Sequence, residues 1–251
     1  MTKTKEARIE ATQDRKTMMW EGQKNTFGLL PGLPSCGGTC ENATTEKGGC
    51  FYTPPGRKLP VCYVFSKMNF RPAIKALLKR NTDLLVDAKS KDQQAMFRCE
   101  FDRFLAADEK HGVKRHFYRI HWSGDCPDTR YTANLRADME EYPQIQFWGY
   151  SRNLFTVPIR SGLKNCTWRI STDIVNRKTH LEYLTRKGFI GIDGLPKNNS
   201  NISYCYMSTE NDISAQLFSC PTDTGQMEFV GACARCMNCV TGRQPVYFKT
   251  K

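Results

Sequence analysis

The sequence contains no run of about eighteen apolar residues, the length that a membrane-spanning helix needs. We therefore expect neither an integral membrane protein nor a membrane partner. The opening Met1-Thr-Lys-Thr-Lys-Glu-Ala-Arg8 lacks the apolar core of a secretory signal, which predicts a cytosolic address. Internal repeats and low-complexity segments are missing as well, which leaves an ordinary globular protein.

Acidic residues are in deficit. The chain has 25 Asp and Glu against 37 Lys and Arg, a formal net charge of +12. Such a charge favours a polyanionic partner, nucleic acid or a nucleotide, through nonspecific electrostatics. The basic residues are scattered along the chain rather than gathered in one block, so an ordinary solvated surface explains them equally well.

The 251 residues, 39% of them hydrophobic, suffice for one large domain with its own core. Residues 1–25 are charged and predict a mobile or peripheral arm, whereas residues 26–251 predict a single α/β domain. Glycine, proline and cysteine crowd the start of that domain up to Gly56, which indicates turns. A short strand over residues 61–65 and two helices between residues 71 and 108 are expected next.

Farther along the chain, strand patterns alternate with helix patterns. Strands are predicted over residues 117–122, 145–150, 167–171 and 202–207. One helix is predicted from Asp128 or Thr129 to Tyr142, and another around Leu181 that ends near Gly188. This alternation predicts an α/β fold with parallel strands, either a partial (βα) barrel or an open parallel sheet. Cysteine-rich segments flank it, one N-terminal over residues 36–62 and one C-terminal over residues 220–239.

Twelve cysteines are many for a cytosolic chain, where disulfides are rare and clustered thiols more often ligate metal. The C-terminal group is the more specific signal. Its run Cys233-Ala-Arg-Cys236-Met-Asn-Cys239 repeats a two-residue gap, and the remote Cys220-Pro221 offers a fourth thiolate. Ferredoxin-type ligands are arranged in this way, which favours an iron–sulfur cluster of the 4Fe–4S type. A tetrahedral zinc ion is the alternative.

The N-terminal group, with wider and unequal gaps, consists of Cys36, Cys40, Cys50 and Cys62. Neighbouring glycines would let the backbone wrap closely and point amides at sulfur, as around a cluster. A structural zinc clip fits this group equally well. The protein would then hold one or two iron–sulfur clusters. The remaining cysteines, Cys99, Cys126, Cys166 and Cys205, are expected to be small hydrophobic residues.

Polar residues follow three of the predicted strands: His121-Trp-Ser123-Gly124-Asp125, Tyr150-Ser-Arg152 and Ser171-Thr-Asp173. The carboxyl ends of parallel strands meet at one edge of a sheet, so these side chains should form one site. There Asp125 and Asp173 could bind ribose hydroxyls or an amine, Arg152 a carboxylate or phosphate, and His121 could move a proton.

Ser123, Gly124 and Ser171 belong to the same segments and are candidates for cofactor contacts. For each polar residue, a structural role as a helix N-cap or in a buried ion pair is the alternative. The other histidines, at positions 111, 116 and 180, lie in charged sequence and are expected at the surface.

Several of these segments, taken in order, resemble the gene product 88 family of bacteriophage proteins. The similarity spans residues 27 to 240 and rests on Phe27-Gly-Leu-Leu-Pro-Gly32, Cys40-Glu-Asn-Ala-Thr44, His121-Trp-Ser-Gly-Asp125, Phe147-Trp-Gly-Tyr-Ser-Arg152, Arg169-Ile-Ser-Thr-Asp173 and the closing cysteine-rich segment. The resemblance implies a phage protein located in the host cytoplasm.

More remotely, the order of features is similar to radical S-adenosylmethionine enzymes. These too place a cysteine-rich loop before parallel βα units and an auxiliary cysteine cluster after them. The three-cysteine motif of that superfamily has gaps of three and two residues, and only the first gap is present here, between Cys36 and Cys40. If all four N-terminal cysteines hold one cluster, no iron is left open for S-adenosylmethionine.

Two hypotheses of different classes follow. The first is a phage iron–sulfur protein whose reductive or radical chemistry takes place where His121, Asp125, Arg152 and Asp173 meet, with S-adenosylmethionine as a cofactor. The second is a non-enzymatic module, stabilised by iron–sulfur or zinc, that binds nucleic acid or a host protein. The sequons Asn42-Ala-Thr44 and Asn201-Ile-Ser203 would suit an extracellular disulfide protein, against which the missing signal weighs.

Overall fold

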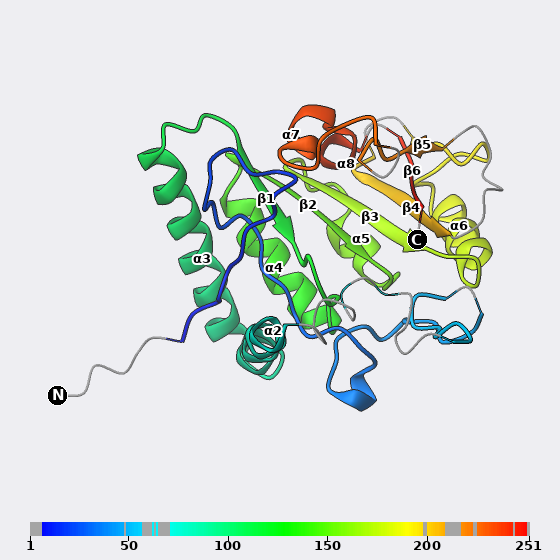
Figure 1. Cartoon of the computed structure of the whole chain (residues 1–251), viewed down its shortest axis with the longest axis horizontal. Helices are drawn as coiled ribbons and strands as arrows, with labels where there is room; N and C mark the ends of the chain where they lie inside the picture. The colour runs from blue at the N-terminus through cyan, green and yellow to red at the C-terminus, as the bar shows by residue number, and fades with distance from the viewer. Residues whose placement is uncertain are drawn as a thin grey trace.

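The computed structural model describes residues 7–47, 49–56, 62, 64, 71–197, 200–208, 217–222, 225–242 and 244–249. Six strands form one sheet in the order β1-β2-β3-β4-β6-β5, and every neighbouring pair is parallel. The strands are β1 (His116–Ile120), β2 (Ile145–Ser151), β3 (Cys166–Thr172), β4 (Ile202–Ser208), β5 (Phe218–Ser219) and β6 (Val246–Lys249). The sheet is open and curled into a half-barrel, as Figure 1 shows, so the expected fold class is confirmed.

Five of the described helices pack on one face of this sheet (Figure 1). They are α2 (Pro72–Leu85), α3 (Ser90–Lys110), α4 (Thr129–Glu141), α5 (Thr156–Arg160) and α6 (Arg177–Arg186). The opposite face carries two short helices, α7 (Ala232–Cys236) and α8 (Asn238–Thr241), which belong to the C-terminal cysteine-rich segment. A 3-10 turn, η1 (Pro34–Cys36), lies in the N-terminal cysteine-rich segment.

Strand alternation divides the buried side chains between these two faces. In β2, Ile145 and Phe147 join the core beneath helices α2 to α6, whereas Trp148 and Tyr150 face the cysteine-rich segment. The second core is smaller and contains the thiols of Cys205, Cys220 and Cys239. The half-barrel therefore presents one face covered by helices and a large apolar core, and one face rich in sulfur.

The expected arm is packed rather than peripheral in its described part, residues 7–25. Ile9 is 1% exposed and Ala11 is 3% exposed, and residues 25–27 run beside β1, where Arg119 N–H donates to Asn25 O. The arm also supports the C-terminal segment, because Cys233 N–H donates to Lys16 O over 2.8 Å. Backbone hydrogen bonds anchor this segment. The expectation of a peripheral arm was based on its charged side chains, which carry no information about such bonds.

The strand expected over residues 61–65 falls mostly outside the described residues, and Val64, which is described, is helical rather than extended.

His180 is buried at 7% exposure and not at the surface, because its imidazole fills the space between α6 and the end of β2.

Gly149 in β2 is required by the ring of Trp168 on the neighbouring strand. A Cβ at this position would lie 3.0 Å from Ile120 O and closer still to the Trp168 ring. We predict that Gly149→Ala lowers the free energy of unfolding by about 1–3 kcal/mol through overpacking. Urea denaturation would measure the loss, with the exposed Thr179→Ala on α6 as control. Equal stability of the two variants would contradict this packing.

Candidate metal centres and the polar edge of the sheet

The carboxyl ends of β1, β2 and β3 bring together three of the four predicted catalytic residues. Asp125 follows β1, Arg152 follows β2 and Asp173 follows β3, and all three are less than 8% exposed. Arg152 connects the other two: its backbone N–H donates to Asp125 Oδ2 over 2.7 Å, and its Nη1 donates to Asp173 Oδ2 over 2.5 Å. The sequence-based placement of these residues on one edge therefore agrees with the geometry.

Asp125 is held by donors from three segments. Its Oδ1 accepts from Ser151 Oγ and from Cys126 N–H, each over 2.7 Å, and its own N–H donates to Thr39 Oγ1 over 3.0 Å. Burial raises the pKa of Asp125 to about 6, although these hydrogen bonds oppose the rise. The carboxylate thus ties the N-terminal loop to the ends of β1 and β2.

Asp173 accepts hydrogen bonds on both of its carboxylate oxygens. Oδ2 takes the Arg152 guanidinium and also Thr44 Oγ1 at 2.7 Å, while Oδ1 accepts from the N–H groups of Val175 and Asn176. The side chains of Arg152 and Asp173 are 9% and 2% exposed, so the pair is a buried salt bridge. The Asp173 carboxylate thus joins the N-terminal loop, through Thr44, to the residues just before α6.

His121 points into the core beneath the helices. Its Nε2 lies 2.8 Å from Tyr131 Oη, its ring meets Phe27 edge-on at 5.1 Å, and Cys126 Sγ lies 4.0 Å from Nδ1. Burial, with a smaller contribution from Arg160, lowers the pKa of His121 to about 3. The ring is therefore neutral near pH 7 and fitted to a hydrogen-bonding role.

The three predicted cofactor contacts have structural partners. Ser123 Oγ donates to Leu29 O over 2.9 Å. Gly124 has a φ of 74°, and a Cβ there would lie 2.8 Å from Leu29 O, so only glycine lets the two segments approach. Ser171 is buried and hydrogen-bonds toward Cys205 on the sulfur-rich face.

Three of the four N-terminal cysteines lie together beside the polar edge. Burial raises the pKa of Cys40, and the nearby Asp125, Cys62 and Cys50 raise it as well. Cys62 N–H donates to Cys50 O over 2.8 Å, which holds these two positions side by side. Cys36, in contrast, is exposed in η1, where its sulfur lies 4.0 Å from Ser35 Oγ.

All four C-terminal cysteines line one pocket on the sulfur-rich face: Cys220, Cys233, Cys236 and Cys239. A left-handed residue, Met237 with a φ of 61°, ends α7 and starts α8, so that the chain wraps around the pocket. The remaining lining is mostly apolar, with Phe218, Met227, Ala232 and Val246. Burial raises the pKa values of Cys233 and Cys239.

Within the described ranges, no three or more His, Cys, Asp or Glu side chains are arranged closely enough to hold a single metal ion. The four C-terminal thiols are related in the structure by lining the same pocket.

Arg169 of β3, fully buried, holds the C-terminal segment on the sheet. Its Nη2 donates to Asn238 O over 2.5 Å and its Nη1 to Gln244 O over 2.8 Å, and it lowers the pKa of Cys239 against the larger effect of burial. In the described part of the chain, no carboxylate forms a salt bridge with this guanidinium. Its positive charge therefore faces carbonyl oxygens and thiols.

Sequence reasoning missed three residues of the sulfur-rich face. Cys205 was expected to be an isolated hydrophobic residue, yet it lies near Cys239, and Tyr150 hydrogen-bonds to that same thiol. Arg169 entered only as part of a family motif. Strand alternation offered a signal, because Tyr150, Arg169 and Cys205 occupy the face of their strands opposite Phe147, Trp168 and Tyr204.

These features define an α/β half-barrel protein flanked by two cysteine-rich segments. The chain belongs to the family described as Gene product 88, whose model matches residues 1–242, so the predicted resemblance is confirmed. Among its relatives, the Gene 88 protein of Mycobacterium phage L5 is 26% identical over 257 residues, covering 97% of this chain and 98% of the relative. The Gene 88 protein of Mycobacterium phage D29 is 27% identical over 263 residues, with the same coverage.

No solved structure matches this chain, and the remote similarity to radical S-adenosylmethionine enzymes stays a prediction. None of the helices in the described ranges combines the length and the apolar character needed to cross a bilayer. Bacteriophage membership agrees with the expectation from the motifs, whereas the host cytoplasm as location stays a prediction.

The buried pair of Arg152 and Asp173 should be a major source of stability. We predict that Arg152→Ala costs about 3–5 kcal/mol of unfolding free energy, because it leaves Asp173 as an unpaired buried charge. The double variant Arg152→Ala/Asp173→Asn should recover part of that loss. Urea denaturation of the full cycle gives the coupling, and Lys79→Ala, from an exposed pair with Asp83, should cost no more than about 1 kcal/mol.

Asp125 should make stability depend on acidity. Its pKa rises from 3.8 unfolded to about 6 folded, so the native state binds more protons between those values. The unfolding free energy contributed by this group therefore falls as the pH rises from about 4 to 6, by at most about 1.4 kcal/mol per pH unit. Asp125→Asn should make the decline shallower, whereas Ser151→Ala, which keeps the carboxyl group, should not. Parallel pH profiles for both variants would contradict the assignment.

Proposed function

We propose that this family member is an iron–sulfur protein whose principal cluster is held by Cys220, Cys233, Cys236 and Cys239. The observation that supports this proposal most is that these four thiols line one pocket although Cys220 is thirteen residues from its nearest partner in the sequence. A 4Fe–4S cluster needs four thiolates converging from a wrapped loop, one for each iron.

The electrostatics of the pocket favour an anionic occupant. Thiolates around iron carry excess negative charge, and the fully buried Arg169 lies close enough to Cys239 to oppose the pKa rise that burial imposes on it. The thiols are costly to ionise in an apolar pocket without such compensation, and a bound metal supplies the rest of it. Tyr150 adds a hydrogen bond to the same sulfur, the type of contact that tunes a cluster potential.

A second metal site is proposed at the polar edge, with Cys40, Cys50 and Cys62 as ligands. Their neighbours are Asp125 and Arg152, so a metal there would adjoin the polar residues that follow β1 and β2. Cys36 is exposed in η1 and fits this set less well than its partners. Reductive chemistry on a small anionic substrate or on S-adenosylmethionine is the reaction class that such a site would support.

One observation favours the non-enzymatic function as the second candidate. Asp125 and Asp173, the predicted catalytic carboxylates, already accept hydrogen bonds from neighbouring backbone and side chains on both oxygens. Groups so engaged hold loops in place. A metal-stabilised binding module would need no more from them than that.

Anaerobic purification followed by iron, sulfide and zinc analysis tests the principal site. We expect a brown protein with about four iron and four sulfide atoms for each cluster. Cys233→Ala/Cys236→Ala should lose the C-terminal share, while Cys99→Ala, an exposed thiol on α3, should lose none. A colourless protein with stoichiometric zinc would replace iron by zinc in the proposal, and a metal-free protein would refute both sites.

The N-terminal site is tested separately by a matched pair of variants. Cys40→Ala should remove the second metal, whereas Cys36→Ala should retain it, because only the former lies among the other thiols. Visible absorption and iron content of each variant distinguish the cases. Loss of metal in both variants would assign Cys36 to the ligand set as well.

A further inference from the structure

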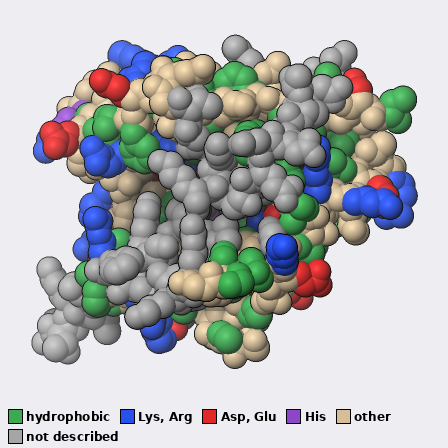
Figure 2. Space-filling view, turned by 45° about the vertical axis from the view of Figure 1, so that its right-hand side comes forward, with side chains coloured by type: hydrophobic (Ala, Val, Ile, Leu, Met, Phe, Trp, Pro, Cys, Tyr) green, Lys and Arg blue, Asp and Glu red, His purple; other side chains and the backbone are tan. Residues whose placement is uncertain are grey.

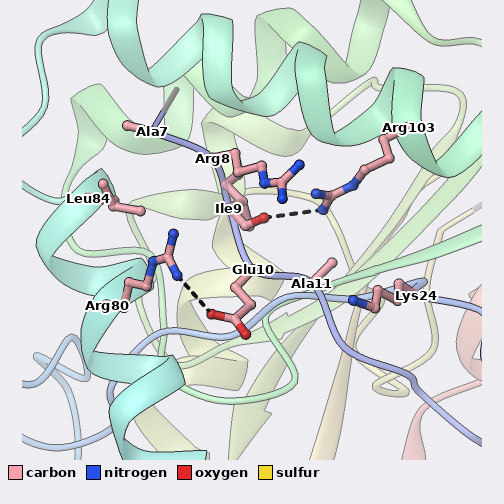
Figure 3. A pocket seen from close by; sticks show the side chains of 9 residues that line it. All are labelled: Ala7, Arg8, Ile9, Glu10, Ala11, Lys24, Arg80, Leu84 and Arg103. Atoms are coloured by element: carbon pink, nitrogen blue, oxygen red, sulfur yellow. Dashed lines mark hydrogen bonds and ion pairs between the residues drawn. The ribbon is translucent and has the colours of Figure 1, made fainter. Parts of the chain in front are cut away.

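A cavity of about 370 Å³ lies on the helix side of the molecule, apart from both cysteine groups. Its walls are the N-terminal segment 7–11, the loop at Lys24, and the exposed sides of α2 and α3 (Figure 3). The volume is in the range of small-ligand sites. Neither the metal centres nor the polar edge uses any residue of this cavity.

The cavity wall is rigidly built. Asn81, fully buried in α2, accepts from Glu10 N–H over 2.9 Å and donates to Glu10 O over 3.0 Å, so it pairs with the backbone of the N-terminal segment as a strand would. Arg103 of α3 donates to Ile9 O over 3.2 Å. The segment is therefore fixed between the two helices, and the cavity does not depend on a bound molecule to form.

Positive charge dominates the lining. Four cations line it, Arg8, Lys24, Arg80 and Arg103, against the single carboxylate of Glu10. Glu10 meets Arg80 only at 3.4 Å and with both side chains about half exposed, and the buried Glu100 forms an ion pair with Arg103. Figure 3 shows the guanidinium groups of Arg8 and Arg103 pointing toward one another. An anion between these two guanidinium groups would reduce their mutual repulsion.

Basic residues elsewhere do not converge in this way on the face that Figure 2 shows, where Lys and Arg are spread over several separate places. We propose that the cavity binds a phosphate group, carried either by a nucleotide or by a nucleic acid backbone. Guanidinium groups match phosphate oxygens in pairs, and Lys24 adds a point charge at the rim. A polyanionic partner attracted by the net charge of +12 would then bind the protein at this cavity.

Fluorescence anisotropy of a labelled single-stranded oligonucleotide, with ATP and inorganic tripolyphosphate as competitors, tests this on the full chain as purified. Arg8→Glu/Lys24→Glu removes two exposed cations of the cavity, and Lys178→Glu/Arg186→Glu on α6 makes the same change of net charge elsewhere. We expect at least tenfold weaker binding for the cavity variant and less than threefold for the control. Unchanged thermal unfolding of both variants verifies that each is folded.

The source of the phosphate follows from the competition. Efficient displacement by tripolyphosphate and ATP indicates a nucleotide-sized ligand. Binding that only oligonucleotide competes, with a salt dependence that is shallower in the cavity variant, indicates a backbone. Either result supports the proposal. Equal binding by the cavity and control variants, or no binding of any of the three probes at low salt, would overturn it whatever metal the protein contains.

Discussion

The sulfur-rich face depends on the hydrogen bonds that the buried guanidinium of Arg169 donates to backbone oxygens. A buried cation is costly unless its donors are used, and here they are used on backbone oxygens of Tyr204 in β4 and of Asn238 and Gln244 in the C-terminal segment. Those bonds clamp α8 onto β3 and so place Cys239 over the sheet. Thr167 of the same strand also donates to Val240 O, and Val240 is fully buried against the sheet, so α8 is held by polar and apolar contacts together.

The polar edge of the sheet holds the N-terminal loop in place, as Arg169 holds the C-terminal segment. Turns rich in glycine and proline bury little apolar surface, so polar contacts must hold them. Thr39 reaches the backbone of Asp125, and Thr44 reaches the carboxylate of Asp173, which Arg152 also neutralises. The same carboxylates that the sequence suggested for catalysis thus position the thiols of the loop. Support and reactivity need not exclude one another, since a group that orients metal ligands also sets the charge around them.

The regular part of the fold was predictable because its signals are local. Strand patterns over residues 145–150, 167–171 and 202–207 correspond to β2, β3 and β4, and the Asp128 cap marks the start of α4. The strands β5 and β6 were missed, because two and four residues are too few for an alternation to register. The anchoring of residues 7–25 and the role of Arg169 were beyond reach for a different reason. Both depend on hydrogen bonds to backbone oxygens from distant segments, which leave no periodicity in the chain.

The two thiol groups lie near the same buried side chains. Burial lowers the pKa of Arg152, but Cys50 of the N-terminal group and Cys205 are among the neighbours that raise it, and Cys205 in turn lies near Cys239 of the C-terminal group. Ser171 of β3, the strand between β2 and β4, forms a side-chain hydrogen bond with Cys205. A change of charge at one group would therefore be felt at the other through a short series of buried side chains in a medium of low dielectric constant. The parallel sheet brings these residues close together, because Arg152 directly follows β2, and Ser171 of β3 is paired with Cys205 of β4.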